Sequence, residues 1–230
     1  TINGFLDRIA DYLAHHRNLT ANAAHELRSP LAAMLNSVEV ALHQERSPEE
    51  YQELLGSVVE ECTRLGSLVQ QLLLLAESDT GRLERANERV RLDVLASRAA
   101  EMFHAVAEGR GLHLEVDSGS EVNVWGDRGQ LRQVVFNLLD NALKFTPSGS
   151  VRISVHAAGD RAILAVADSG IGISQANLPR IFDRFFRADQ ARSRTHSSGS
   201  GLGLSICQVL VGAHGGTMSV DSELGRGTTM

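Results

Sequence analysis

Cysteine is scarce in this sequence, aromatic residues are few, and positive charge is not in excess. The two cysteines, Cys62 and Cys207, lie in apolar helical patterns far apart in the chain, so we expect buried thiols and no disulfide framework. Lys and Arg number 22 against 28 Asp and Glu, a formal net charge of −6. Without a basic field to hold a polyanion, nucleic acid is not expected as a ligand.

Long apolar runs are also missing. No window approaches the roughly 18 apolar residues of a membrane-spanning helix, and no signal peptide precedes Thr1. The chain starts at Thr and ends in a strand-like stretch, so we expect it to be an excised piece of a longer protein. Its 230 residues, 43% of them hydrophobic, suffice for one large or two small globular domains.

The N-terminal third is predicted to form a helical hairpin. One polar-rich helical pattern covers residues 2–43 and a second covers residues 49–78. Ser47 and Glu50 form a capping box, and Pro48 falls at the first helical position, where its missing N–H is not needed. The start of the second helix is therefore well marked.

Both predicted helices carry apolar stripes with heptad-like spacing. The stripe of the first helix is Leu27, Leu31, Leu35, Val38 and Leu42, and that of the second is Leu54, Val58, Leu65, Leu68, Leu72 and Leu75. Two helices alone leave such stripes half exposed to water, so we expect homodimerisation into a four-helix bundle. The alternative is that the stripes pack on the C-terminal part of the same chain.

The predicted secondary structure changes from long helices to alternating short strands and helices after a polar stretch at residues 78–88. Helices are expected at 92–108, 127–145 and 203–213, and strands near 112–116, 122–125, 151–157, 162–167 and 217–220. Short strands that alternate with helices indicate a mixed sheet covered by helices, an α/β sandwich. The fold class is thus predicted to be α+β with two domains, a helical hairpin followed by the sandwich. Residues 187–200 have the composition of a loop.

The helix at 127–145 carries polar side chains on one face. Asp127 can cap it, with Gln130 three residues on. Asn137, Asn141 and Lys144 recur at i, i+4 and i+7 and therefore line up together. Amide oxygens suit Mg²⁺ and an ammonium group suits a phosphate. A solvated polar stripe on a surface helix is the alternative.

Two glycine motifs follow. Asp168 ends an apolar strand and is followed by Gly170 and Gly172, so its carboxylate could accept a hydrogen bond from an exocyclic amine such as that of adenine. A turn without a ligand is the alternative. The second motif presents backbone N–H groups near a helix N-terminus, an arrangement suited to phosphates; its glycines are Gly199, Gly201 and Gly203.

His25 stands out among nine histidines. It lies two residues from Leu27, about 200° round a helix, so it should project from the bundle surface. Glu26 can fix its tautomer or accept its proton. Pro30 removes the helical hydrogen bond to the Glu26 carbonyl and can bend the helix there. The other histidines show no spacing typical of a structural metal site.

Together, these stretches resemble the kinase core of sensor histidine kinases of two-component systems and, behind it, the ATPase superfamily of gyrase and MutL. Residues 24–31 resemble the H box of that family, 137–145 its N box, 168–172 its first glycine box, 181–187 its F box and 199–204 its second glycine box. Residues 225–229 are similar to the strand that closes the sheet. The likeness covers nearly the whole chain.

The resemblance implies an ATP-dependent protein-histidine kinase with a Bergerat-type ATP-binding domain. His25 would be phosphorylated and would pass the group to an aspartate of a response regulator. The implied catalytic residues are His25, Glu26 and Ser29. The implied cofactors are ATP and Mg²⁺, with the metal held by Asn137 and Asn141. The implied nucleotide-binding residues are Asn137, Asn141, Lys144, Phe145, Asp168, Gly170, Gly172, Arg187, Gly199, Gly201, Leu202 and Gly203.

By the same resemblance, Asp168 would bind adenine N6 while Lys144 and Arg187 contact phosphates. Phe145 would stack on the nucleotide or merely pack beside it, and residues 189–198 would form the ATP lid. The family usually has Thr or Asn where this chain has Ser29, which makes phosphatase activity toward the regulator less certain than kinase activity.

The resemblance also implies where the domain boundaries of the chain lie. Residues 1–17 would be the end of a signal-transmitting helix, 18–80 the dimerisation and phosphoacceptor hairpin, 81–88 a linker and 89–230 the catalytic domain. We therefore expect a cytoplasmic fragment of a plasma-membrane sensor. Two rival functions are an ATPase without a phosphoprotein, which needs a Glu where this chain has Asn137 or Asn141, and a nucleotide-binding scaffold.

Overall fold

The computed structural model describes residues 2–43, 46–84, 86–188 and 199–230, with side chains in the first helix described from Thr20 onward. The predicted lid, residues 189–198, lies outside the described residues. The chain divides into two compact units, Thr1–Glu77 and Ser78–Met230, and each is described by itself. In the described part, no helix is long and apolar enough to cross a membrane.

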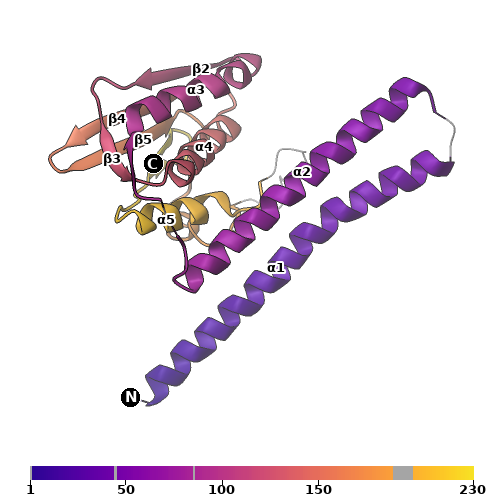
Figure 1. Cartoon of the computed structure of the whole chain (residues 1–230), viewed down its shortest axis with the longest axis horizontal. Coiled ribbons are helices and arrows are strands. Elements are labelled where there is room, and N and C mark those ends of the chain that lie inside the picture. The colour runs from indigo at the N-terminus through magenta and orange to yellow at the C-terminus, as the bar shows by residue number, and fades with distance from the viewer. Residues whose placement is uncertain (1, 44–45, 85, 189–198) are drawn as a thin grey trace. The chain divides into compact units, whose positions relative to one another are not determined.

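The first unit is the predicted hairpin. Helix α1 (Ile2–His43) and helix α2 (Pro48–Asp79) run antiparallel (Figure 1). The capping box that was predicted from the sequence is present, since Ser47 N–H donates to Glu50 Oε2 at 2.8 Å and Glu50 N–H to Ser47 Oγ at 3.2 Å. The turn that precedes α2 is therefore held by local hydrogen bonds.

The two predicted stripes behave differently within this hairpin. The α2 stripe faces inward, with Leu68 buried, whereas Leu31, Leu35 and Leu42 of α1 are 51%, 55% and 79% exposed. The less exposed positions of α1 are Ala23, Glu26, Leu27, Pro30, Met34, Ser37 and Ala41, and the Met34 sulfur lies 3.5 Å from the Cys62 sulfur. Most of the α1 stripe is therefore exposed within one hairpin, and the expected four-helix bundle stays a prediction.

Helix α2 also has an outer apolar row that the sequence reasoning missed. Its large members are Leu55, Val59, Val69 and Leu73, all exposed. Cys62 is exposed although its sulfur touches that of Met34, so the prediction that both thiols are buried is wrong for Cys62. The reason is that apolar residues on a two-helix hairpin do not all reach its single interface.

The second unit contains the α/β sandwich. Its elements are β1 (Glu88–Arg91), α3 (Leu92–Gly109), β2 (Leu112–Asp117), β3 (Asn123–Gly126), α4 (Arg128–Phe145), β4 (Gly149–Ala158), β5 (Arg161–Asp168), a 3₁₀ turn at Leu178–Arg180, α5 (Gly203–Ala213), β6 (Asp221–Glu223) and β7 (Gly227–Thr229). Strands β1 and β3 form a separate two-stranded antiparallel sheet.

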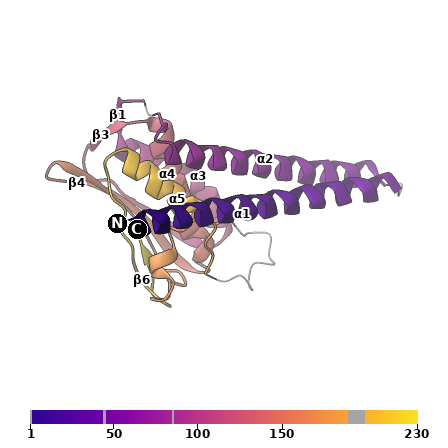
Figure 2. The same ribbon diagram turned by 90° about the horizontal axis from the view of Figure 1, so that it is seen from below.

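The main sheet has five strands in the order β2-β4-β5-β7-β6. The β2–β4 pair is parallel and the other pairs are antiparallel. Helices α3 and α4 pack against the sheet, and α5 packs beside α4 (Figure 2). Between them lies a core of fully buried side chains such as Leu139, Ile153 and Ile206. This layering matches the predicted sandwich.

One strand was predicted in the wrong place. Residues 217–220 alternate as a strand would, yet they are irregular, and the strand begins at Asp221. Its position is set by pairing with β7, where the Ser222 hydroxyl lies 2.9 Å from both the Gly227 carbonyl oxygen and Thr228 Oγ1. Alternation alone does not reveal which residues find a partner strand.

Candidate functional site

Helix α4 is fastened at its N-terminus by Asp127. One carboxylate oxygen accepts the Gln130 N–H at 2.9 Å and the other accepts the Ala86 N–H at 3.1 Å. These backbone donors, Gln130 first, lower the pKa of Asp127. The predicted cap therefore starts the helix and also holds the segment that leads into the domain.

The polar face of α4 meets the second glycine motif. The Asn137 side-chain amide donates to the Gly203 carbonyl oxygen at 3.3 Å. A Cβ at Gly203 would lie 3.8 Å from Asn137 Cγ and 3.9 Å from Asn141 Nδ2, and one at Gly199 would lie 4.0 Å from Lys144 Nζ. Because both amides and the ammonium face the glycine loop, the alternative of a purely solvated stripe is not what the fold shows.

Lys144 already has a partner on its own helix. Its ammonium lies 2.5 Å from Asp140 Oδ2, and both side chains are partly exposed. The sequence reasoning did not single out Asp140, although its i, i+4 spacing to a lysine was a usable signal. The ion pair places the ammonium beside Gly199, where an anion could compete for it.

Asp168 stands half-buried at the end of β5. Its Oδ1 accepts the Gly170 N–H at 2.9 Å, so Oδ2 is the oxygen left to face a ligand. Burial raises the pKa of this carboxyl group, and the backbone N–H groups of Gly170 and Thr228 oppose the rise. Partial desolvation strengthens any hydrogen bond that the ionised carboxylate accepts.

The first glycine box packs against the end of α4. A Cβ at Gly170 would lie 2.3 Å from the Phe145 carbonyl oxygen, and that oxygen accepts the Ile171 N–H at 3.1 Å. Gly172, with φ +66°, lies so close to the β6–β7 turn that a Cβ would come within 2.0 Å of the Glu223 carbonyl oxygen. Both glycines are needed for close backbone approach.

The F box and the second glycine box are joined in the same way. The Phe185 N–H donates to the Gly201 carbonyl oxygen at 2.9 Å, and a Cβ at Gly201 would lie 2.8 Å from the Phe185 carbonyl carbon. Phe185 itself has φ 62°, a left-handed conformation that costs a residue with a side chain about 1–2 kcal/mol. The surrounding contacts therefore hold a strained residue beside the glycine loop.

The remaining predicted residues are placed as follows. The Phe145 ring is 55% exposed and so is free to stack. The Leu202 side chain is fully buried, so only its backbone could meet a ligand. Arg187 is half-buried and lies two residues before residue 189, where the described part is interrupted. Among the described contacts, none is a hydrogen bond or ion pair between Arg187 and the residues above.

The candidate phosphoacceptor lies in the first unit. His25 and Ser29 are exposed on α1, and Glu26 is half-buried. Pro30 is buried inside the helix, five residues on from His25. An exposed imidazole beside a carboxylate is accessible to an incoming phosphoryl group.

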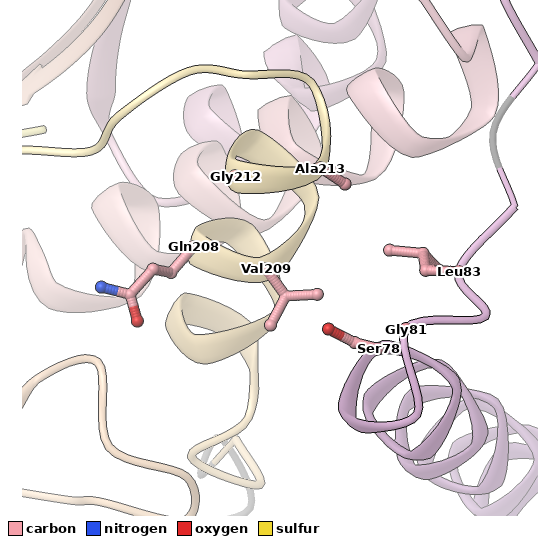
Figure 3. A pocket seen from close by; sticks show the side chains of 7 residues that line it. All are labelled: Ser78, Gly81, Leu83, Gln208, Val209, Gly212 and Ala213. Atoms are coloured by element: carbon pink, nitrogen blue, oxygen red, sulfur yellow. The ribbon is translucent and has the colours of Figure 1, made fainter.

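A shallow groove of about 480 Å³ lies elsewhere in the second unit, between the segment 78–83 and the outer side of α5 (Figure 3). Its lining residues are Ser78, Gly81, Leu83, Gln208, Val209, Gly212 and Ala213. None of the predicted nucleotide-binding residues lines it. Nearby in sequence, Asp79 forms a bidentate ion pair with Arg184 of the F box at 2.6 and 2.7 Å, a contact that the sequence reasoning missed.

A resident metal is not supported by clustered ligands. In the part of the chain that the structure describes, no three His, Cys, Asp or Glu side chains group together. The buried Cys207, whose pKa is raised by burial to about 12, is an inert thiol.

Comparison with known proteins agrees with this arrangement. Residues 15–81 match the His Kinase A phospho-acceptor domain, and residues 126–230 match the histidine kinase-, DNA gyrase B- and HSP90-like ATPase family. The solved structure of the mycobacterial sensor histidine kinase MprB is 32% identical, with a TM-score of 0.53, over 62% of this chain and 93% of that one. The chain belongs to the sensor histidine kinase family.

Longer relatives of this histidine kinase match both units. The sensor histidine kinase CusS of Escherichia coli O6:H1 is 37% identical over 99% of this chain and 47% of its own length, so the chain spans about half the length of the curated relatives it matches. Histidine kinase ThkA, solved in complex with the response regulator TrrA, has a TM-score of 0.72 over 96% of this chain and 61% of that one. At 21% identity, that likeness shows the fold alone.

The predicted family and fold class are thus confirmed. The second unit is an ATP-binding domain of the family that includes DNA gyrase B. The first unit carries the phospho-acceptor domain in which His25 lies.

Proposed function

We propose that this chain phosphorylates His25 with ATP and passes the phosphoryl group to an aspartate of a response regulator. The observation that carries the proposal is the contact of the α4 amides with the glycine loop at Gly203. It would bring phosphate-binding groups together in a chain that also exposes His25 within a phospho-acceptor domain. Positioning and charge neutralisation are the main demands of phosphoryl transfer.

The adenine end of ATP would bind at Asp168. Gly170 occupies Oδ1, so Oδ2 would accept the adenine N6–H. The exposed Phe145 ring would stack on the base. At the other end, Lys144 and Arg187 would meet the phosphates, and the backbone of residues 199–203 would donate N–H groups to them.

Asn137 and Asn141 fit a role as ligands of Mg²⁺. With Asn137 Nδ2 engaged by Gly203, its amide oxygen is available, and oxygen is the donor that Mg²⁺ prefers. Two neutral amides do not balance a divalent charge, so the ion would enter together with the nucleotide. When bound, it neutralises charge on the phosphate oxygens during transfer.

At the hairpin, a ring nitrogen of His25 would attack the γ-phosphorus. A nitrogen–phosphorus bond forms, the bond from that phosphorus to the bridging oxygen breaks, and ADP leaves. Glu26 would orient the imidazole and accept its remaining ring proton. The Ser29 hydroxyl, exposed one helical turn further on, would position water for a phosphatase reaction toward the regulator.

A homodimer is part of the proposal. The exposed rows on α1 and α2 would be covered by a second copy in a four-helix bundle, and each buried Leu would contribute about 1.5–3 kcal/mol. Leu35→Glu should therefore convert the dimer to a monomer in light scattering. The control is Asn36→Glu, which adds the same charge at the next residue. A wild-type monomer would contradict the dimer.

We further propose that the chain is the cytoplasmic part of a membrane sensor. The support is that its relatives are about twice as long and that α1 extends well upstream of His25, as a signal-transmitting helix would. Expression of the complete parent protein, followed by membrane fractionation, tests this location.

The enzymatic proposal is tested with γ-labelled ATP and Mg²⁺. The expected label is acid-labile, base-stable and lost in His25→Gln, whereas His43→Gln, at another exposed histidine of the hairpin, keeps it. Asp168→Asn should lose nucleotide affinity. Label that persists in His25→Gln would overturn the phosphoacceptor assignment. Tight ATP binding without any label would favour a scaffold or a plain ATPase.

A further inference from the structure

His214, directly after α5, makes two hydrogen bonds that define its protonation. Its Nδ1 lies 2.8 Å from the Leu210 carbonyl oxygen, which can only accept, so Nδ1 carries the proton. Its Nε2 accepts the Asp127 backbone N–H at 2.9 Å, so Nε2 carries none. The ring is therefore neutral with its proton on Nδ1.

The position of the His214 ring requires a glycine at position 126, which faces the ring. A Cβ at Gly126 would lie 2.3 Å from His214 Cδ2, so the imidazole rests directly on the backbone where β3 passes into α4. The Asp127 carboxylate, the charged group beside it, is occupied by Gln130 and Ala86. The bond to His214 is thus made by the backbone of Asp127 alone.

Helices α4 and α5 touch at three levels. His214 meets Asp127 at one end, the Cys207 sulfur lies 3.8 Å from the Val134 carbonyl oxygen in the middle, and the Gly203 carbonyl oxygen meets Asn137 at the other end. These contacts advance by seven and then three residues along α4, and they go back by seven and then four residues along α5. The helices therefore run antiparallel in a fixed axial register over about 15 Å, at ~1.5 Å per residue.

Apolar packing between the helices does not fix that register by itself. The inner face of α5, which includes Ile206 and Leu210, is fully buried, but such contacts are non-directional and allow sliding between ridges and grooves. Hydrogen bonds at the two ends are directional. One end is the phosphate side of the pocket, at Asn137 and Gly203, and the other is His214.

We propose that His214 is a positioning residue of the nucleotide site. By clamping the far end of α5 to the start of α4, it holds the glycine loop opposite Asn137 and Asn141. This inference rests on the proposed function in that ATP phosphates bind between those elements. The adenine end of the pocket is built from Asp168 on β5 and Phe145 at the far end of α4, and neither lies on α5, so it does not depend on where the clamp holds α5.

That separation supplies the test. ATP and adenosine affinities are measured by calorimetry on the full chain and on His214→Leu, with His156→Leu, at an exposed histidine of β4, as the control. His214→Leu should weaken ATP about tenfold, the effect of one lost hydrogen bond of ~1.4 kcal/mol, and leave adenosine within about twofold. Equal weakening of both ligands in a folded His214→Leu variant would overturn the proposal.

Two further measurements keep the inference decidable if His214→Leu does not fold. His214→Gln, which keeps one donor and one acceptor, should retain most of the ATP affinity. Nitrogen-15 spectra of the wild-type chain should show protonated Nδ1 and unprotonated Nε2 at His214; the opposite tautomer would refute the clamp. A wild-type chain that binds neither ligand would instead reject the proposed function, whatever the tautomer shows.

Discussion

Replacing Gly172 by alanine should damage both stability and adenine binding, because two separate penalties meet at this residue. The first is conformational, since Gly172 has φ +66° and a left-handed backbone costs a residue with a Cβ about 1–2 kcal/mol. The second is steric. The new Cβ would lie 2.0 Å from the Glu223 carbonyl oxygen and 2.7 Å from its carbon.

The size of the steric penalty depends on how far the Glu223 carbonyl group can move away from the new Cβ. Real Cβ contacts essentially never fall below 3.0 Å, so the glycine loop and the β6–β7 turn must separate by about 1 Å. Both sides of the contact are backbone, and the turn is tied back by the Gly225 N–H, which donates to the Ile171 carbonyl oxygen at 2.8 Å. The loop that carries Gly170 must therefore move, and with it the donor that orients Asp168.

Gly159 is a matched control within the same sheet. It has φ +63° in the β4–β5 turn, but a Cβ there would meet nothing within 4 Å. Gly159→Ala should therefore cost only about 1–2 kcal/mol of unfolding free energy and leave nucleotide binding unchanged. The difference between the two variants isolates the steric part.

The assay combines denaturant unfolding with titration of adenosine and ATP. Gly172→Ala should be the less stable variant and should weaken both ligands by about ten- to a hundredfold, the range expected for a displacement of about 1 Å. Both ligands suffer because adenine is the shared part. If Gly172→Ala matched Gly159→Ala in stability and bound adenosine normally, the packing of the turn on the loop would be refuted.

Two further outcomes are expected. The Arg91 guanidinium hydrogen-bonds to Asp93, and with the Val122 N–H it lowers the pKa of Asp93 from 3.8 to about 2. The stability that this shift adds is present above about pH 4 and is lost as the pH falls toward 2. The acid unfolding curve of Asp93→Asn should therefore converge with that of the wild type only between those pH values, and parallel curves would contradict this. Asp140→Asn should strengthen ATP binding about two- to fivefold, because it releases Lys144 from a partly exposed ion pair worth ~0.2–1 kcal/mol. Adenosine binding should stay constant, and equal gains in affinity for both ligands would refute this.

Helices and caps could be predicted closely from the sequence because their signals are local. The bonds between Ser47 and Glu50, and from Gln130 to Asp127, are formed as predicted, and α5 has the predicted bounds. The strands β1 and β6 were missed or misplaced, since a strand of three or four residues exists only where a partner strand pairs with it.

The candidate site divides in the same way. Which residues belong to it could be proposed from the order and spacing of the motifs. Their contacts could not, since Asn137 and Gly203 are 66 residues apart in sequence. The positive φ of Phe185 and the clamp at His214 carried no signal that a single sequence could reveal, because both arise from long-range packing.

Periodicity, capping residues and motif order thus determined the helices, the two-part architecture and the family, all of which depend on neighbours within a few turns of the chain. Tertiary structure alone decided which apolar stripe of the hairpin faces inward, where β6 pairs, and which polar atoms meet around the glycine loop. These features depend on contacts between segments that are far apart in sequence, and the free energy of such packing cannot be deduced from any one segment alone.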